Sequence, residues 1–261
     1  MPGSHEITGH YGRADLGAVI LAALAAAGKD IDRLTPDDLE PVDELHSRGR
    51  AATIELAGLL ALNGTERILD LGSGIGGPSR YLAKTFGCRV TGLDLTPEFC
   101  RVATMLEGDA LATLLPAQSF DVVWSQAMAM NIADRDRLYA EIRRVVKPAG
   151  RYAFSDVISG PAGAPHFPVP FARDASISFL LTAETTRHKL EAAGFRVLVF
   201  EDVTADALAR AQARTKVSGA PLALGLHIVL GQDGPTMLKN MARNYEERRI
   251  GLIQGVAVRP E

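Results

Sequence analysis

The sequence has little cysteine, little net charge and no long hydrophobic run. Its two cysteines, Cys88 and Cys100, cannot form a disulfide framework and have no metal-ligand partners at motif spacing. The 28 basic and 31 acidic residues nearly balance, which gives no indication of a nucleic-acid or anionic-membrane partner. No apolar run reaches the roughly 18 residues that span a bilayer. These absences predict a soluble, metal-free, cytoplasmic protein, and the moderate apolar content is compatible with a monomer or a homodimer.

The first quarter of the chain has a helical pattern. Residues 1–10 are polar and are expected to be mobile unless a ligand orders them. Residues 16–27 are apolar but lack a cleavage-site pattern, so we interpret them as a helix rather than a signal peptide. Apolar residues recur at helical spacing over residues 14–62. Residues 1–63 are therefore predicted to form a helical N-terminal cap.

Short apolar segments then alternate with helical ones. The predicted strands are residues 67–71, 89–94, 120–125, 151–157 and 195–203. This alternation predicts an α/β fold with a doubly wound, mostly parallel sheet over residues 64–203. Residues 204–251 are mostly helical and too long for a loop, so they are predicted to form a helical insertion or lid. Residues 252–261 would supply the last strand of the core.

A glycine-rich turn follows the first predicted strand. Gly72, Gly74 and Gly77 satisfy the pattern G-x-G-x-x-G between a strand and a helix, which is typical of several nucleotide sites. Asp70 separates these possibilities, because its carboxylate would repel a pyrophosphate but attract an ammonium and a sulfonium group. Asp94, at the end of the second strand, could bind both ribose hydroxyls of either kind of ligand.

These segments resemble the class I S-adenosylmethionine-dependent methyltransferases. The resemblance rests on five segments in family order: the glycine turn 70–76, the acidic strand end 93–95, the turn 108–110, the strand 120–126 and the segment 146–154. It implies a Rossmann-like methyltransferase fold, with S-adenosylmethionine as cofactor and S-adenosylhomocysteine as product. The implied cofactor-binding residues are Asp70, Gly72, Ser73, Gly74, Asp94, Leu95, Asp109, Ala110, Ser125 and Gln126.

The flanking segments are similar to a small-molecule branch that contains sarcosine/dimethylglycine and tocopherol-type methyltransferases. This similarity favours methylation of the nitrogen of a small amine, and it leaves C- or O-methylation of a specialised metabolite open. His46 and His166 are the candidate general bases, because an imidazole titrates near working pH. Tyr11 could close over the sulfonium or the acceptor.

An alternative of a different class is an NAD-dependent oxidoreductase on the same kind of sheet. It predicts an apolar residue where Asp70 stands, together with a catalytic Tyr/Lys or His/Asp set. We find no such set in the sequence, so this alternative is the weaker one.

The segment between Thr96 and Gly108 is shorter than the family pattern requires. A helix, a loop and a third parallel strand take about 25 residues together. The third strand is therefore expected to be missing, either because a segment is absent from the sequence as written or because of a genuine deletion. We favour the first interpretation, since losing a strand beside the sheet centre would unfold the domain. A genuine deletion would first put Asp109 and Ala110 in doubt.

Overall fold

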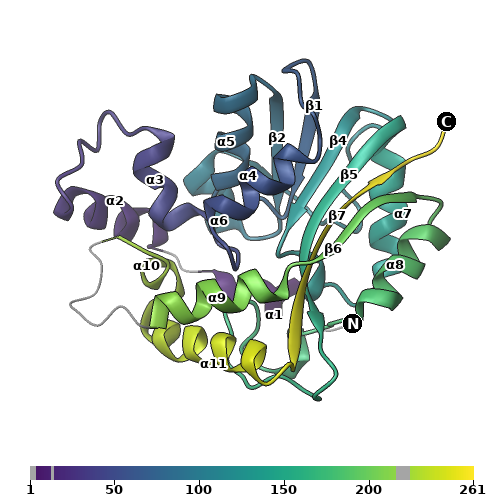
Figure 1. The fold of residues 1–261 in the computed structure, drawn as a ribbon. Helices are drawn as coiled ribbons and strands as arrows, with labels where there is room; N and C mark the ends of the chain where they lie inside the picture. Colours follow the sequence, from purple (N-terminus) through teal and green to yellow (C-terminus); the bar gives the residue numbers. More distant parts are fainter. Residues whose placement is uncertain (1–3, 13–14, 216–223) are drawn as a thin grey trace.

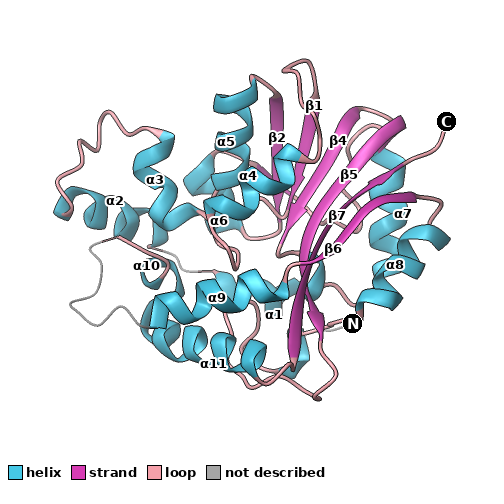
Figure 2. Ribbon diagram, in the orientation of Figure 1, coloured by secondary structure: helices cyan, strands magenta, loops and turns pink. Residues whose placement is uncertain are grey.

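The computed structural model describes residues 4–12, 15–215 and 224–261. These residues form one seven-stranded sheet with the order β3-β2-β1-β4-β5-β7-β6 (Figure 2). Strand β7 runs antiparallel to its neighbours β5 and β6, and the other pairs are parallel. This topology confirms the predicted mostly parallel, doubly wound sheet. None of the helices in the described ranges is long and apolar enough to cross a bilayer.

Apart from the two-residue β3, the strands lie in the apolar segments of the sequence. They are β1 (Arg67–Leu71), β2 (Arg89–Asp94), β3 (Leu106–Glu107), β4 (Phe120–Gln126), β5 (Val146–Ser159), β6 (Arg196–Asp202) and β7 (Ile250–Val258). The central strands β1 and β4 are buried on both faces, as expected of near-continuous apolar runs in a parallel sheet. Strand β7 begins at Ile250, two positions before the predicted start.

Helices cover both faces of the sheet (Figure 1). On one face, α4 (Arg50–Gly58) and α5 (Gly77–Phe86) pack through Leu56 and Leu82 onto Trp124 and its neighbours. On the other face, α7 (Arg135–Val145) and α8 (Ala183–Ala192) pack onto the aromatic residues of β5. The two cores are separated by the sheet because successive residues of a strand point to opposite faces.

The remaining helices gather around the carboxyl ends of the parallel strands (Figure 1). The N-terminal ones are α1 (Ser4–Tyr11), α2 (Leu16–Ala26) and α3 (Pro36–Asp43), and those before the last strand are α9 (Thr204–Thr215), α10 (His227–Leu230) and α11 (Gly234–Glu246). Ile7 of α1 packs in one cluster with Met241 of α11. The helical cap and the helical insertion are thus both present. Residues 4–10 belong to α1, although residues 1–10 were expected to be mobile unless a ligand orders them.

The third strand is present, so the expectation that it is missing was wrong. Strand β3 pairs only with the last two residues of β2, Leu93 and Asp94. The chain therefore has to run back along the sheet by only two strand residues, about 7 Å, before β3 begins. The seven residues of helix α6 (Pro97–Ala103) span about 10 Å, which is enough for this return. Thr104 adopts a positive φ of 55° and turns the chain into β3. The figure of about 25 residues assumed a helix and a strand of ordinary length.

Candidate functional site

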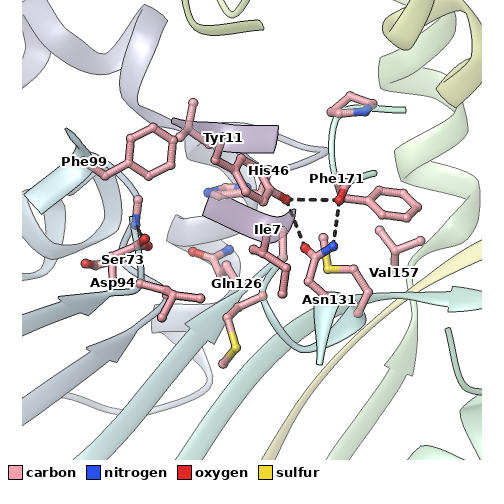
Figure 3. A pocket seen from close by; sticks show the side chains of 18 of the residues that line it. Ile7, Tyr11, His46, Ser73, Asp94, Phe99, Gln126, Asn131, Val157 and Phe171 are labelled. Carbon is pink, nitrogen blue, oxygen red and sulfur yellow. Dashed lines mark hydrogen bonds between the residues drawn. The ribbon is translucent and has the colours of Figure 1, made fainter. Parts of the chain in front are cut away.

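A cavity of about 800 Å³ opens where β1, β2 and β4 end. Open α/β sheets bind ligands at this edge. Figure 3 shows Ser73 and Asp94 on one side of the cavity and Val157 and Phe171 on the other. Helices α1, α10 and α11 close it on the side away from the strand ends. The cavity therefore has one wall of strand ends and turns and another of helices and loops.

Asp70 lies at the end of β1 and lines the cavity, with 2% of its surface exposed. Ser79 of α5 donates a hydrogen bond to Asp70 Oδ2 at 2.6 Å. Burial raises the pKa of Asp70 to about 7, in spite of the Ser79 hydrogen bond, and the negative charges of Asp94 and Glu44 add to the increase. A buried carboxylate of this kind favours a cationic ligand.

The glycine turn after β1 requires glycine for two reasons. Gly72 and Gly74 have positive φ angles of 75° and 56°. A Cβ atom on Gly72 would also lie 2.3 Å from Met128 Cγ. The backbone N–H groups of Gly72 and Ser73 donate to Leu93 O, which joins the turn to the end of β2. The turn and Ser73 therefore line the cavity in a fixed conformation.

Asp94 at the end of β2 is held by the same turn. Gly74 N donates to Asp94 Oδ2 at 2.9 Å, and Thr96 N donates to Oδ1 at 2.8 Å. Burial raises the pKa of Asp94, although these hydrogen bonds lower it. These bonds fix the carboxylate where it lines the cavity. Leu95 also lines the cavity beside Asp94.

The turn after β3 reaches the cavity despite the short crossover. Asp109 and Ala110 both line it. Leu111 N donates to Asp109 Oδ1 at 2.8 Å, which shapes the turn. Because β3 pairs with the very end of β2, the turn that follows it lies beside Asp94.

The structure separates the neighbours Ser125 and Gln126. Ser125 has no exposed surface, lies 2.9 Å from the Tyr152 hydroxyl and does not line the cavity. Gln126 lines the cavity with 7% of its surface exposed. Trp124 Nε1 and Thr53 Oγ1 contact Gln126 Oε1 at 3.2 and 3.1 Å, while Gln126 Nε2 is buried without a partner among the described residues. Since strand residues alternate between faces, only one of the two neighbours could point to the site.

Of the two candidate histidines, one lies in the cavity lining and the other does not. His46 lines the cavity, and its Nε2 lies 2.8 Å from Glu44 Oε2. His166 lies outside the cavity lining, where its Nε2 is 2.8 Å from Oε2 of Glu247, the residue that follows α11. The structure therefore does not bring His166 to the site, because the loop that carries it folds back onto α11 through Asn244.

The sequence analysis missed Glu44, which does not line the cavity itself but contacts His46, which does. Its buried carboxylate accepts hydrogen bonds from Arg50 Nε and, at 2.9 Å, from Thr53 Oγ1. Burial raises the pKa of Glu44, but its contacts with His46 and Arg50 outweigh burial and lower it. The available signal was the spacing of Glu44 and His46, two positions apart in one loop.

Tyr11 bridges the cavity from α1. Its hydroxyl donates to Asn131 Oδ1 at 3.0 Å and lies 3.3 Å from Phe171 O (Figure 3). Burial raises the pKa of Tyr11 far above its usual value, and the negative charge of Asp94 adds to this. The phenol is therefore a neutral hydrogen-bond donor at working pH.

Comparisons with known proteins agree with this geometry. A family model described as a methyltransferase domain matches residues 69–154. The sarcosine/dimethylglycine N-methyltransferase of Halorhodospira halochloris is 30% identical over 198 residues, which is 70% of each chain. The 2-methyl-6-phytyl-1,4-hydroquinone methyltransferase of Synechocystis is 38% identical over 115 residues, which is 40% of this chain and 36% of that protein.

Another relative is much longer than the match. A glycine/sarcosine/dimethylglycine N-methyltransferase of Actinopolyspora halophila is 32% identical over 177 residues. The match covers 63% of this chain and 31% of that protein. Among solved structures, phosphoethanolamine N-methyltransferase 2 of Haemonchus contortus in complex with S-adenosyl-L-methionine superposes with a TM-score of 0.69. That match is 19% identical and covers 98% of this chain and 60% of the other. At this identity it shows the fold alone.

Proposed function

Because the chain belongs to the class I S-adenosylmethionine-dependent methyltransferases, we propose that it transfers a methyl group from S-adenosylmethionine to a small molecule in the cavity described above. The observation that carries this proposal is the convergence of two buried carboxylates, Asp70 and Asp94, on one glycine turn. Both have raised pKa values, and a ligand with cationic groups and ribose hydroxyls suits them. The NAD-dependent oxidoreductase alternative predicted an apolar residue at position 70. Membership of the methyltransferase family excludes this alternative.

We assign the holding of the methyl donor to the strand-end wall. Asp70 binds its ammonium group, and Asp94 binds its ribose hydroxyls with Leu95 alongside. The backbone of Gly72, Ser73 and Gly74 allows the close approach that a side chain would block. Asp109 and Ala110 contact the base. S-adenosylmethionine supplies a methyl group that its sulfonium has already activated, so the chain has to orient the acceptor and exclude water. Helices α1 and α11 perform the second task as a lid.

The first acceptor candidate is the nitrogen of a small amine such as sarcosine or dimethylglycine. The names of two relatives support it. The second candidate is a specialised metabolite methylated on carbon or oxygen. The apolar residues of the helix-and-loop wall favour this second class, because a zwitterion gains little from such a surface.

Isothermal titration tests the proposal with S-adenosylmethionine, S-adenosylhomocysteine and NAD. We expect micromolar binding of both sulfur ligands by the wild type and loss of both in Asp70→Ala. Asp32→Ala, an exposed carboxylate in the N-terminal cap, is the matched control and should bind like the wild type. Preferential binding of NAD, or no binding of either sulfur ligand, would overturn the proposal.

A further inference from the structure

The helix-and-loop wall of the cavity offers mostly apolar surface. Its side chains come from segments far apart in the sequence, namely Ile7, Phe171, Phe179, Leu230 and Leu238, and Val157 of β5 adjoins them. Burying an apolar group against such a wall is favourable, by about 25 cal/mol for each Å² removed from water. The same wall penalises a carboxylate or an ammonium group that loses its water.

The polar groups of this wall are already satisfied by one another. Tyr11 donates to Asn131, whose Nδ2 donates to Phe171 O at 2.7 Å. The Tyr245 hydroxyl donates to Ser47 Oγ at 3.1 Å. Among the described residues that line the cavity, Lys239 is the one Lys or Arg side chain, and it is exposed. The wall therefore lacks the buried cation that a zwitterionic amino acid would need for its carboxylate.

Where the two walls meet, two hydrogen-bonding atoms have no partner within the part of the chain that the structure describes. Trp124 Nε1 can only donate, so the Gln126 atom that it contacts is the amide oxygen. This leaves Gln126 Nε2 as a buried donor without a partner among the described residues. Glu44 likewise orients His46, because its carboxylate accepts from Nε2 and leaves Nδ1 as the acceptor nitrogen.

A free donor and a free acceptor on two cavity-lining side chains suit a group that accepts one hydrogen bond and donates another, such as a hydroxyl. A hydroxyl group both donates and accepts a hydrogen bond, whereas a tertiary amine has no proton to donate. Thr53 Oγ1 lies 3.1 Å from Gln126 Oε1 and 3.2 Å from His46 Nε2, so one residue links the two side chains. Figure 3 shows His46 and Gln126 between the strand-end wall and the apolar wall.

We propose that the acceptor is a largely apolar molecule with a phenol or enol hydroxyl, and that the enzyme methylates this oxygen. The inference rests on the proposed function and narrows its acceptor. Gln126 Nε2 donates to the hydroxyl oxygen, and the apolar body lies against Leu230 and Leu238.

The proton balance assigns a role to the His46–Glu44 pair. S-adenosylmethionine supplies the methyl group as an electrophile and leaves as S-adenosylhomocysteine. The acceptor O–H bond breaks, its oxygen forms the new C–O bond, and His46 Nδ1 takes the proton. Glu44 stabilises the resulting imidazolium through Nε2, and His46 returns the proton to water when the methyl ether departs. Glu44 is thus a positioning residue.

The test begins with binding, which does not depend on turnover. Protein saturated with S-adenosylhomocysteine is titrated with phenol and 4-alkylphenols up to 4-pentylphenol, with dimethylglycine and with sarcosine. We expect affinity to increase roughly fourfold with each methylene group. Leu238→Ser should flatten this dependence, whereas the exposed Leu114→Ser should leave it unchanged. 4-Pentylanisole, which lacks the hydroxyl proton, should bind more weakly than 4-pentylphenol.

Turnover then separates the roles of the polar residues. With 4-pentylphenol, the expected product is its methyl ether, identified by mass spectrometry. His46→Gln should lower kcat about 100-fold or more while 4-pentylphenol and S-adenosylhomocysteine affinities change less than threefold. Glu44→Gln should lower kcat about tenfold with KM nearly unchanged. Gln126→Met should weaken 4-pentylphenol binding about fivefold and leave S-adenosylhomocysteine affinity unchanged.

The contrary outcomes are distinguishable. Methylation of dimethylglycine or sarcosine, without binding or turnover of the alkylphenols, would overturn the inference and leave the proposed function intact. Ring methylation, or a His46→Gln variant with wild-type kcat, would overturn the assignment of oxygen and of the base. Loss of S-adenosylhomocysteine binding in Gln126→Met would mean that the Gln126 amide contacts the methyl donor instead of the acceptor. Absence of S-adenosylhomocysteine binding by the wild type would overturn the proposed function itself.

Discussion

The hydroxyl of Tyr11 donates a hydrogen bond to Asn131 Oδ1 at 3.0 Å and thereby joins the N-terminal helix to the segment after β4. Asn131 lies in the short 3-10 helix Ala129–Asn131 and is itself held by the carbonyl groups of Phe171 and Ile177. Helix α1, most of which was expected to be mobile unless a ligand orders it, is therefore attached to a hydrogen-bonded part of the cavity wall. This attachment leads to the first prediction.

Tyr11→Phe should weaken S-adenosylhomocysteine binding about fivefold, because one net hydrogen bond of about 1 kcal/mol no longer holds the lid closed. Isothermal titration measures the change. Tyr81→Phe removes a hydroxyl outside the cavity and is the matched control. An unchanged affinity in Tyr11→Phe would mean that the lid closes without this bond.

The raised pKa of Asp70 predicts a pH-dependent affinity. Below about pH 7 the free protein carries a proton on Asp70, and the attraction for a ligand ammonium group is lost. We expect S-adenosylhomocysteine affinity to increase about tenfold from pH 6 to pH 8. Asp70→Asn should bind more weakly and show no such pH dependence. An equally steep dependence in Asp70→Asn would assign the titration to another group.

The same carboxylate should cost stability. Its pKa is 3.8 ordinarily and about 7 in the folded chain, so the folded state binds more protons between these values. Stability therefore falls as pH rises through this window, and the full cost, of order 4 kcal/mol, is present above pH 7. Asp70→Asn should increase the free energy of unfolding by about 2–4 kcal/mol at pH 8 and by little at pH 4. Urea unfolding at both pH values measures this, and a loss of stability at pH 8 would contradict it.

Gly72→Ala should destabilise the fold by about 2–4 kcal/mol, because a left-handed φ and a collision with Met128 act together. Chemical unfolding measures the loss. Gly58→Ala is the matched control, since a Cβ there meets no atom within 4 Å and the residue ends helix α4. It should be neutral or slightly stabilising. The double variant Gly72→Ala, Met128→Ala should recover the part of the loss that comes from the collision.

His166→Gln should leave kcat/KM for the methylated acceptor within twofold of wild type, because His166 lies outside the cavity and pairs with Glu247. Its effect on stability should stay below about 1 kcal/mol, because one hydrogen bond between partly exposed side chains contributes little. Steady-state kinetics measures kcat/KM of His166→Gln and of His46→Gln under the same conditions. A tenfold loss in His166→Gln would restore this residue as a candidate base.

Local signals in the sequence predicted the sheet and the strand-end wall. Alternation of apolar strands with helices sets the topology, and a glycine turn with Asp70 before it and Asp94 after the next strand places both carboxylates at one edge. These predictions succeeded because the carboxyl ends of adjacent parallel strands meet regardless of what packs around them. The same reasoning failed for the third strand. The length of the crossover depends on how many residues of β2 pair with β3, and only two of them do.

The sequence by itself determined the fold class and the acidic glycine turn, because both depend on neighbours a few positions apart. Only the tertiary structure decided that Gln126 rather than Ser125 faces the cavity, and that His46 rather than His166 reaches it. It also assembled the apolar wall from helices and loops at both ends of the chain. Tyr11 and Phe171, which meet there, lie 160 positions apart. Such contacts follow from packing over the whole molecule, which leaves no periodic pattern in the sequence.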